Sequence, residues 1–120
     1  MDERLEKALD FSNYMVTLNN QKRLLHEQFQ QEAVHYFKGG QFSVTQQLIS
    51  FCQSLIALEQ ETVVLIDDNQ QPIEIDPLED FLQEILSVYA IASNKYLTEY
   101  ENIKKNRSVE GLVELWAKVY

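Results

Sequence analysis

The sequence predicts a mainly α-helical protein, an antiparallel helical bundle of two long and two shorter helices with one β-hairpin between helices 2 and 3. Three observations favour this class. Apolar residues repeat at helical spacing over two long stretches, no glycine or proline interrupts the first of them, and one β-branched segment separates the helical regions. With 120 residues, of which 45% are hydrophobic, the chain can form one helical domain over residues 1–120.

The first predicted helix runs from Asp2 to Lys38. Phe11, Leu18 and Leu25 stand seven residues apart. A second heptad series, interrupted at Lys22, is formed by Ala8, Met15, Phe29 and Tyr36. Such a helix is about 50 Å long, whereas a small domain is about 30 Å across. We therefore expect it to bend, or to pair along its length with another long helix or another subunit.

A second helix is predicted to follow directly. Gly39 and Gly40 end the first helix, because glycine adopts the left-handed conformation of a helix C-cap. Ser43 and Gln46 form a capping box that begins the second helix at Val44. Its apolar face is too wide for a surface helix, which predicts a core helix. The residues of that face are Val44, Leu48, Ile49, Phe51, Cys52, Leu55, Ile56 and Leu58.

The next segment predicts a β-hairpin, with strands at Thr62–Ile66 and Ile73–Ile75. The loop between them lacks an Asn-Gly or Asp-Gly pair, so we expect four to five loop residues. Because an isolated hairpin is marginally stable, this one should pack on the helices or pair with a neighbour's strand.

A second long helix is predicted after the hairpin. Asp76 as N-cap, with Pro77 at the first helical position and Glu79 at the third, begins a helix that continues to about Asn106. Ser108 then begins a last short helix. Its apolar residues are Val109, Leu112, Val113, Trp116 and Val119.

The net charge of −9 comes from the middle of the chain. Residues 39–94 contain nine acids and no Lys, Arg or His, while the remaining residues carry ten acids and ten bases. Three interpretations are open: a solvated surface, a docking surface for a basic partner, and a divalent cation site. An EF-hand is excluded, because its sixth and twelfth loop positions are Pro72 and Leu78. The candidate docking residues are Asp67, Asp68, Glu74, Glu79 and Asp80.

Aromatic and basic residues of the C-terminal part give two further candidate surfaces. The aromatic residues pack as half-buried rings or form a self-association surface. The candidates for that surface are Tyr89, Tyr96, Tyr100 and Trp116. A basic patch of Lys104, Lys105 and Arg107 could contact nucleic acid, although a pI of about 4.6 disfavours it, as it disfavours anionic membranes.

No catalytic motif is present. Glu32 and His35 form half of a di-iron signature whose second copy is absent, so no metal is predicted. Cys52 lies on an apolar face, where an inert buried thiol is expected. There is no Gly-rich phosphate loop and no Gly-x-Ser-x-Gly, so we predict neither enzymatic activity nor a cofactor. A single cysteine, an acidic N-terminus and no apolar span favour a cytoplasmic protein outside the membrane.

Four phrases of the sequence, LDFSNYMVTLNNQKRLL, KGGQFSVT, VVLIDDNQQPIEID and KKNRSVEGLVEL, resemble small uncharacterised proteins of T4-like phages that infect marine bacteria. The resemblance covers most of the chain and implies an accessory phage protein acting in the bacterial host cytoplasm. It brings no functional residue with it.

The sequence therefore predicts a non-enzymatic interaction or assembly protein that forms a homo-oligomer and presents an acidic surface. One alternative is a regulator that docks on a basic host or phage protein through that surface. Another is a nucleic-acid accessory factor that uses the Lys104–Arg107 patch.

Overall fold

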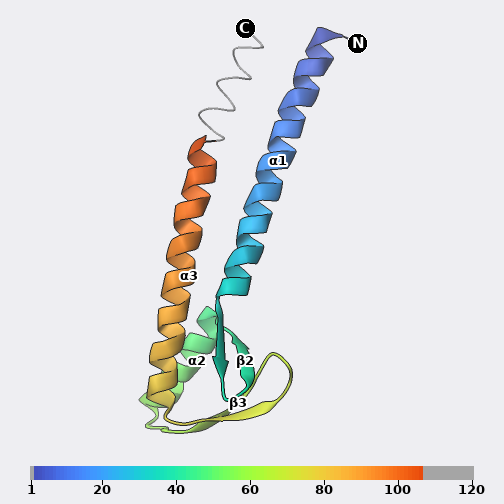
Figure 1. The fold of residues 1–120 in the computed structure, drawn as a ribbon. Coiled ribbons are helices and arrows are strands. Elements are labelled where there is room, and N and C mark those ends of the chain that lie inside the picture. The colour runs from blue at the N-terminus through green and yellow to red at the C-terminus, as the bar shows by residue number, and fades with distance from the viewer. Residues whose placement is uncertain (1, 107–120) are drawn as a thin grey trace. The chain divides into compact units, whose positions relative to one another are not determined.

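The structure is a computed structural model that describes residues 2–106. Its elements, in chain order, are α1 (Glu3–Glu32), β1 (Val34–Phe37), β2 (Gly40–Ser43), α2 (Gln46–Ala57), β3 (Val63–Ile66), β4 (Pro72–Ile75) and α3 (Leu78–Asn106) (Figure 1). The mainly helical class and the hairpin between the second and third helices are confirmed. The predicted four-helix bundle is not matched, because the described residues form three helices and two hairpins. The helix predicted from Ser108 lies outside them.

The chain divides into two compact units. The helical unit comprises Met1–Gln28 with Lys95–Tyr120, and the mixed unit comprises Phe29–Asn94. Both long helices contribute residues to each unit. A single domain over residues 1–120 stays a prediction.

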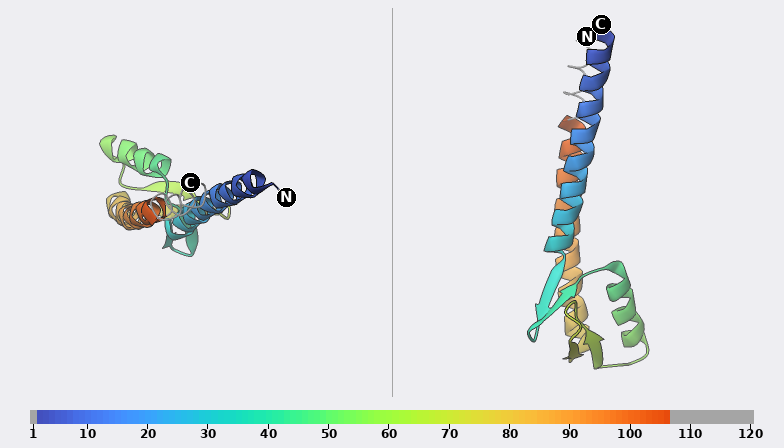
Figure 2. Two further views of the ribbon diagram at one scale, coloured as in Figure 1. Left: turned by 90° about the horizontal axis from the view of Figure 1, so that it is seen from above. Right: turned by 90° about the vertical axis from the view of Figure 1, so that its right-hand side faces the viewer.

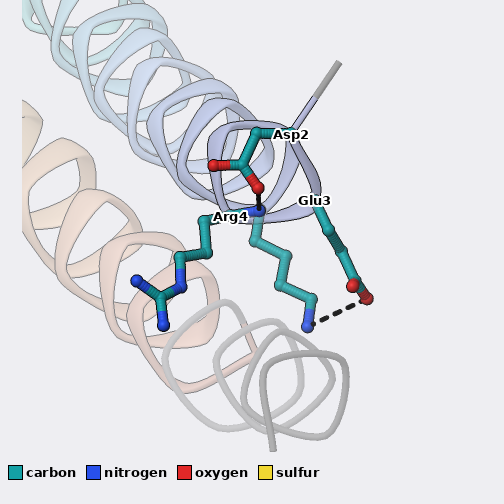
Figure 3. Close-up of polar contacts among 4 residues, drawn as sticks. Asp2, Glu3 and Arg4 are labelled. Carbon is teal, nitrogen blue, oxygen red and sulfur yellow. Dashed lines mark hydrogen bonds and ion pairs between the residues drawn. The ribbon is translucent and has the colours of Figure 1, made fainter.

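In the helical unit, α1 begins next to Asp2, as expected. The backbone N–H of Arg4 donates to Oδ1 of Asp2 at 3.2 Å (Figure 3). The backbone N–H of Glu6 donates to the Asp2 carbonyl at 3.1 Å. Lys7 lies 3.5 Å from the carboxylate of Glu3, one turn apart. Asp2 therefore caps the free N–H groups at the helix N-terminus.

The helical unit pairs α1 with the C-terminal part of α3. The Lys22 ammonium lies 5.4 Å from the ring centroid of Tyr100, and the Tyr96 hydroxyl lies 3.4 Å from Nδ1 of His26. Residue numbers rise along one helix as they fall along the other, so these two segments run antiparallel. Leu18 is the buried apolar residue of this part of α1.

The first helix ends at Glu32 and not at Lys38, which corrects the sequence prediction. Residues Val34–Phe37 form β1, which pairs with β2 in the register Phe37↔Gly40. Lys38 and Gly39 form the two-residue turn, with φ of 49° and 78°. Two positive φ values are what a tight hairpin turn requires, so these residues close a hairpin instead of a helix. Tyr36, expected in a helical apolar series, is 71% exposed on β1.

The start of the second helix also differs from the prediction. Thr45, not Ser43, is the N-cap of α2, and its Oγ1 accepts a hydrogen bond from the Leu48 N–H at 3.1 Å. Ser43 is the last residue of β2. The prediction that α2 contributes to the core holds for Ile49 and Cys52, which are buried. The predicted apolar face is too wide, because Phe51 and Leu58 are 50% and 71% exposed and α2 has a solvent-exposed side.

The hairpin of β3 and β4 has the predicted strands and a loop of five residues, 67–71. Its register pairs Leu65 with Ile73. The third helix begins at Leu78, slightly later than predicted, because the Pro77 carbonyl accepts the Phe81 N–H at 3.3 Å. It is described as far as Asn106, the last residue before the part of the chain that the structure does not describe.

The core of the mixed unit is built around Phe81 of α3, which is 1% exposed. The rings of His35, Phe37 and Phe42 lie edge-on to it, with centroids 5.4 to 5.6 Å away. In the right-hand view of Figure 2, α2 and the β1–β2 hairpin lie on either side of the first part of α3. The two hairpins and α2 are thus held against one helix by apolar packing.

Candidate interaction surfaces

The net charge of the chain belongs to the mixed unit. Residues 29–94 contain ten acids and one base, Lys38, which gives −9. The residues of the helical unit contain nine acids and nine bases, which gives zero. The acidic segment predicted from the sequence is therefore part of one compact unit.

Asp67, the first candidate docking residue, is buried and holds the β3–β4 loop together. It is 5% exposed. Its Oδ1 accepts the backbone N–H of Gln71 at 2.7 Å and that of Asn69 at 3.1 Å. Its Oδ2 accepts the N–H of Gln41 on β2 at 3.0 Å. Asp67 is thus a structural residue rather than part of an exposed surface.

The hydrogen bonds to Asp67 also set its acidity. The Gln41 N–H, followed by the Gln71 N–H, lowers the pKa of the carboxyl group. Burial acts in the opposite direction, and the Asn69 N–H adds a further lowering. The carboxylate is favoured because three N–H donors stabilise its negative charge.

Asp68 continues the attachment of this loop to β2. Its N–H donates to the Gln41 carbonyl at 2.8 Å, and its Oδ1 accepts the Ser43 N–H at 3.2 Å. Its Oδ2 accepts the Ser43 hydroxyl at 2.7 Å. The Val44 N–H donates to the Ala33 carbonyl, so these two residues form a hydrogen-bonded pair next to the hairpin. Because hydrogen-bonded and non-hydrogen-bonded pairs alternate along an antiparallel ladder, the backbone groups of residues 41 and 43 point away from β1. Asp67 and Asp68 therefore close the outer edge of β2.

The remaining candidate docking acids are exposed. Glu74 lies on β4 opposite Val64, and Glu79 and Asp80 lie in the first turn of α3. One turn further on, Glu84 is 2.8 Å from Nε2 of His35. Only some of the predicted acids are thus available to a partner, and their role in docking stays a prediction.

The candidate self-association tyrosines make contacts within the chain. The Tyr89 ring meets Phe29 edge-on at 6.0 Å, and its hydroxyl accepts a hydrogen bond from Gln46. Tyr96 and Tyr100 lie ring to ring at 6.1 Å. All three are half-buried, which agrees with ring packing, and a subunit interface through them stays a prediction. Trp116 lies outside the described residues.

The candidate basic patch is described only in part. Lys104 and Lys105 are exposed in the last turn of α3, where positive charge stabilises the helix C-terminus. Arg107 lies outside the described residues.

Sequence reasoning missed an exposed apolar stripe on α1. Leu5, Leu9 and Val16 are 50%, 45% and 54% exposed. They share a face, because positions four and eleven apart point in nearly the same direction at 3.6 residues per turn. The buried Leu18, two positions after Val16, points about 200° away. The sequence signal for this stripe is the helical spacing of Leu5, Leu9 and Val16, in which the intervening position of the series is the polar Ser12.

His35 and Cys52, which could in principle support chemistry, both lie in structural surroundings. His35 lies on a strand rather than on a helix with Glu32, and it contacts Glu84 and Phe81. Cys52 is fully buried, and burial raises the pKa of its thiol. Among residues 2–106, no three His, Cys, Asp or Glu side chains cluster as a metal site would require. No helix in that range has the length and apolar character to cross a membrane.

Comparison of the chain with protein-family models, with curated proteins and with solved structures finds no match. The resemblance to phage proteins, and the host cytoplasm that it implies, stay predictions.

Proposed function

We propose that this chain is a non-enzymatic interaction protein that self-associates through the exposed face of α1. The observation that carries the proposal is the apolar stripe of Leu5, Leu9 and Val16, which faces away from the buried side of the same helix. A helix with apolar residues on two opposite sides normally contacts a neighbour on both. A partner helix would remove the second stripe from water.

A second copy of α1 is the partner that best fits the stripe. Leu5, Leu9 and Val16, with the polar Ser12 at the remaining position of the series, follow the alternating four- and three-residue spacing of a coiled-coil seam, which packs against a like seam. The helical unit has no net charge, so two copies can approach without long-range repulsion. Two copies of the mixed unit would repel each other, because each carries a net charge of −9. This difference favours α1 as the self-association surface.

The tyrosines are less suitable for an interface than the apolar stripe. Tyr89, Tyr96 and Tyr100 already pack against residues of their own chain, so an interface through them would have to replace those contacts. Leu5, Leu9 and Val16 become buried without any such rearrangement. A role as a phage accessory protein in the host cytoplasm is compatible with this proposal and rests on the sequence resemblance.

Sedimentation velocity tests the proposal on the full chain at tens of micromolar. The double variant Leu9→Lys/Val16→Lys should shift an oligomer to the monomer, because two charges enter the seam. Asn13→Lys/Thr17→Lys adds the same charge at exposed polar positions of α1 and should leave the oligomer unchanged. A monomeric wild-type chain, or equal dissociation by both double variants, would contradict self-association through this stripe.

A further inference from the structure

The outer edge of β3 is an open strand edge. The β3–β4 sheet has two strands, so among the described residues no third strand pairs with β3. The Asp67 N–H donates to the Gln71 carbonyl, and hydrogen-bonded pairs alternate along an antiparallel ladder. Leu65 and Val63 therefore direct their backbone groups towards β4. Val64 and Ile66 direct their N–H and C=O groups away from the sheet.

The side chains of this edge do not protect it. Val64 and Ile66 are 59% and 63% exposed, and both are β-branched and uncharged. Natural edge strands are usually blocked by charged residues, by proline or by a covering segment. Two other edges of the mixed unit follow that rule. The outer edge of β2 is covered by Asp67 and Asp68, whereas that of β4 contains Pro72 and a Glu74 carbonyl that accepts the Lys38 ammonium at 3.2 Å.

The charge around this edge is negative. Glu61 precedes β3, Asp68 follows it, and Glu74 lies opposite Val64 on the same exposed face of the hairpin. All three are exposed in a unit whose net charge is −9. A second copy of this unit would be repelled, whereas a basic segment would be attracted.

We propose that the outer edge of β3 binds an extended segment of a partner protein, in which apolar residues alternate with Lys or Arg. The segment adds a third strand through the backbone groups of Val64 and Ile66. Its apolar side chains lie on the exposed face of Val64 and Ile66. Its basic side chains point to the opposite face, because successive side chains of a strand alternate, and the net charge of −9 of the mixed unit attracts them. Strand addition of this kind takes affinity from main-chain hydrogen bonds and specificity from alternate side chains. This surface is separate from the α1 stripe, so either proposal can fail without the other.

The test uses a synthetic nine-residue peptide of alternating valine and lysine, titrated into the ¹⁵N-labelled full chain. The largest amide shifts should occur at Val64 and Ile66, and affinity should fall as salt is added. The same peptide with glutamate in place of lysine, or with alternate backbone nitrogens methylated, should not bind.

Two variants at one position separate the backbone contribution from the side chain. Val64→Pro removes an outward N–H that β4 does not use, so the hairpin should persist, as a circular dichroism spectrum can check. It should raise the Kd about tenfold, the equivalent of about one hydrogen bond. Val64→Thr keeps the N–H and the β-branched shape, and its Kd should stay within about twofold.

Several outcomes would overturn the proposal. Equal binding of the lysine and glutamate peptides would remove the electrostatic argument, and an unchanged Kd in folded Val64→Pro would remove strand addition. Shifts at Val34 and Tyr36 would place the peptide on the outer edge of β1 instead. Dissociation of an oligomer by Val64→Pro in sedimentation would identify a second copy as the occupant of the edge.

Discussion

The mixed unit and the helical unit differ in how they treat apolar side chains. In the described part of the chain, all buried apolar residues except Leu18 belong to the mixed unit. The helical unit exposes apolar side chains along α1. Those that are at least half exposed are Leu5, Val16 and Leu24. The mixed unit has a core of its own, whereas the described residues of the helical unit leave apolar side chains exposed.

The two units also differ in net charge. The mixed unit carries the whole net charge of −9, and the helical unit carries none. Apolar contact without long-range repulsion suits association between identical copies, whereas a strong negative potential suits a basic partner. This difference supports the proposal of self-association for the helical unit and of partner binding for the mixed unit. The predictions below test how differently the two units are packed.

The largest expected effect is the loss of the aromatic core. Phe81→Ala should lower the free energy of unfolding by about 3–5 kcal/mol, because a fully buried ring surrounded by His35, Phe37 and Phe42 leaves a cavity. Urea denaturation followed by circular dichroism measures it.

The matched substitution in the helical unit is Leu9→Ala. Leu9 is 45% exposed, so the variant should stay within about 0.5 kcal/mol of the wild type when both are monomeric. Protein concentration must be the same in both titrations, because association adds to apparent stability. A loss in Leu9→Ala as large as that in Phe81→Ala would show that the helical unit has an equally important core of its own.

A smaller effect is expected from Asp67→Asn, which replaces one acceptor oxygen by an NH₂ donor. In one orientation of the amide this donor faces the N–H of Gln41, and in the other it faces the N–H groups of Asn69 and Gln71. The variant should be less stable than wild type at pH 7. Asp68→Asn is the control, because Asp68 is exposed on the same loop and should lose less. Equal losses would contradict a special role for the buried carboxylate.

The loss in Asp67→Asn should depend on pH. The pKa of Asp67 is lowered in the folded state, so its carboxylate stabilises the fold above its unfolded pKa of about 3.9. This contribution falls as the pH drops below about 4 and through the lowered pKa. The difference between wild type and Asp67→Asn should therefore be largest near neutral pH and shrink in acid. Thermal unfolding at pH 7, 5 and 3 measures that difference, while the other carboxylates titrate equally in both proteins.

The elements predicted well from the sequence are those with strong local signals. Helix α3 has an acidic, proline-containing start, and the strands on either side of loop 67–71 are β-branched and apolar. The β1–β2 hairpin was missed, because Phe29 and Tyr36 extend a heptad series into β1 and because glycine suits a helix end as well as a turn. The contacts of Phe37 and Phe42 with Phe81, far along the chain, distinguish these alternatives, and such non-local contacts are not evident in the local sequence.

The candidate surfaces were less predictable than the fold. The acidic segment was evident from composition, but the sequence does not distinguish the buried Asp67 from the exposed Asp68 beside it. An aspartate at the start of a polar loop often accepts backbone N–H groups two residues on, but this rule applies to Asp68 as well as to Asp67. The open edge of β3 has no sequence signal at all, because it depends on which strands remain unpaired.

A small stabilising effect is expected at a polar atom of the helical unit. The Tyr14 hydroxyl is buried and has no hydrogen-bond partner among the described residues. A buried unpaired hydroxyl costs stability, so Tyr14→Phe should raise the free energy of unfolding by about 1 kcal/mol. Tyr96→Phe is the matched control, because it removes a hydroxyl that lies 3.4 Å from His26 and should lower stability slightly. If urea denaturation instead shows that Tyr14→Phe is the less stable variant, the hydroxyl has a partner in solution and α1 is more completely packed than its exposed side chains indicate.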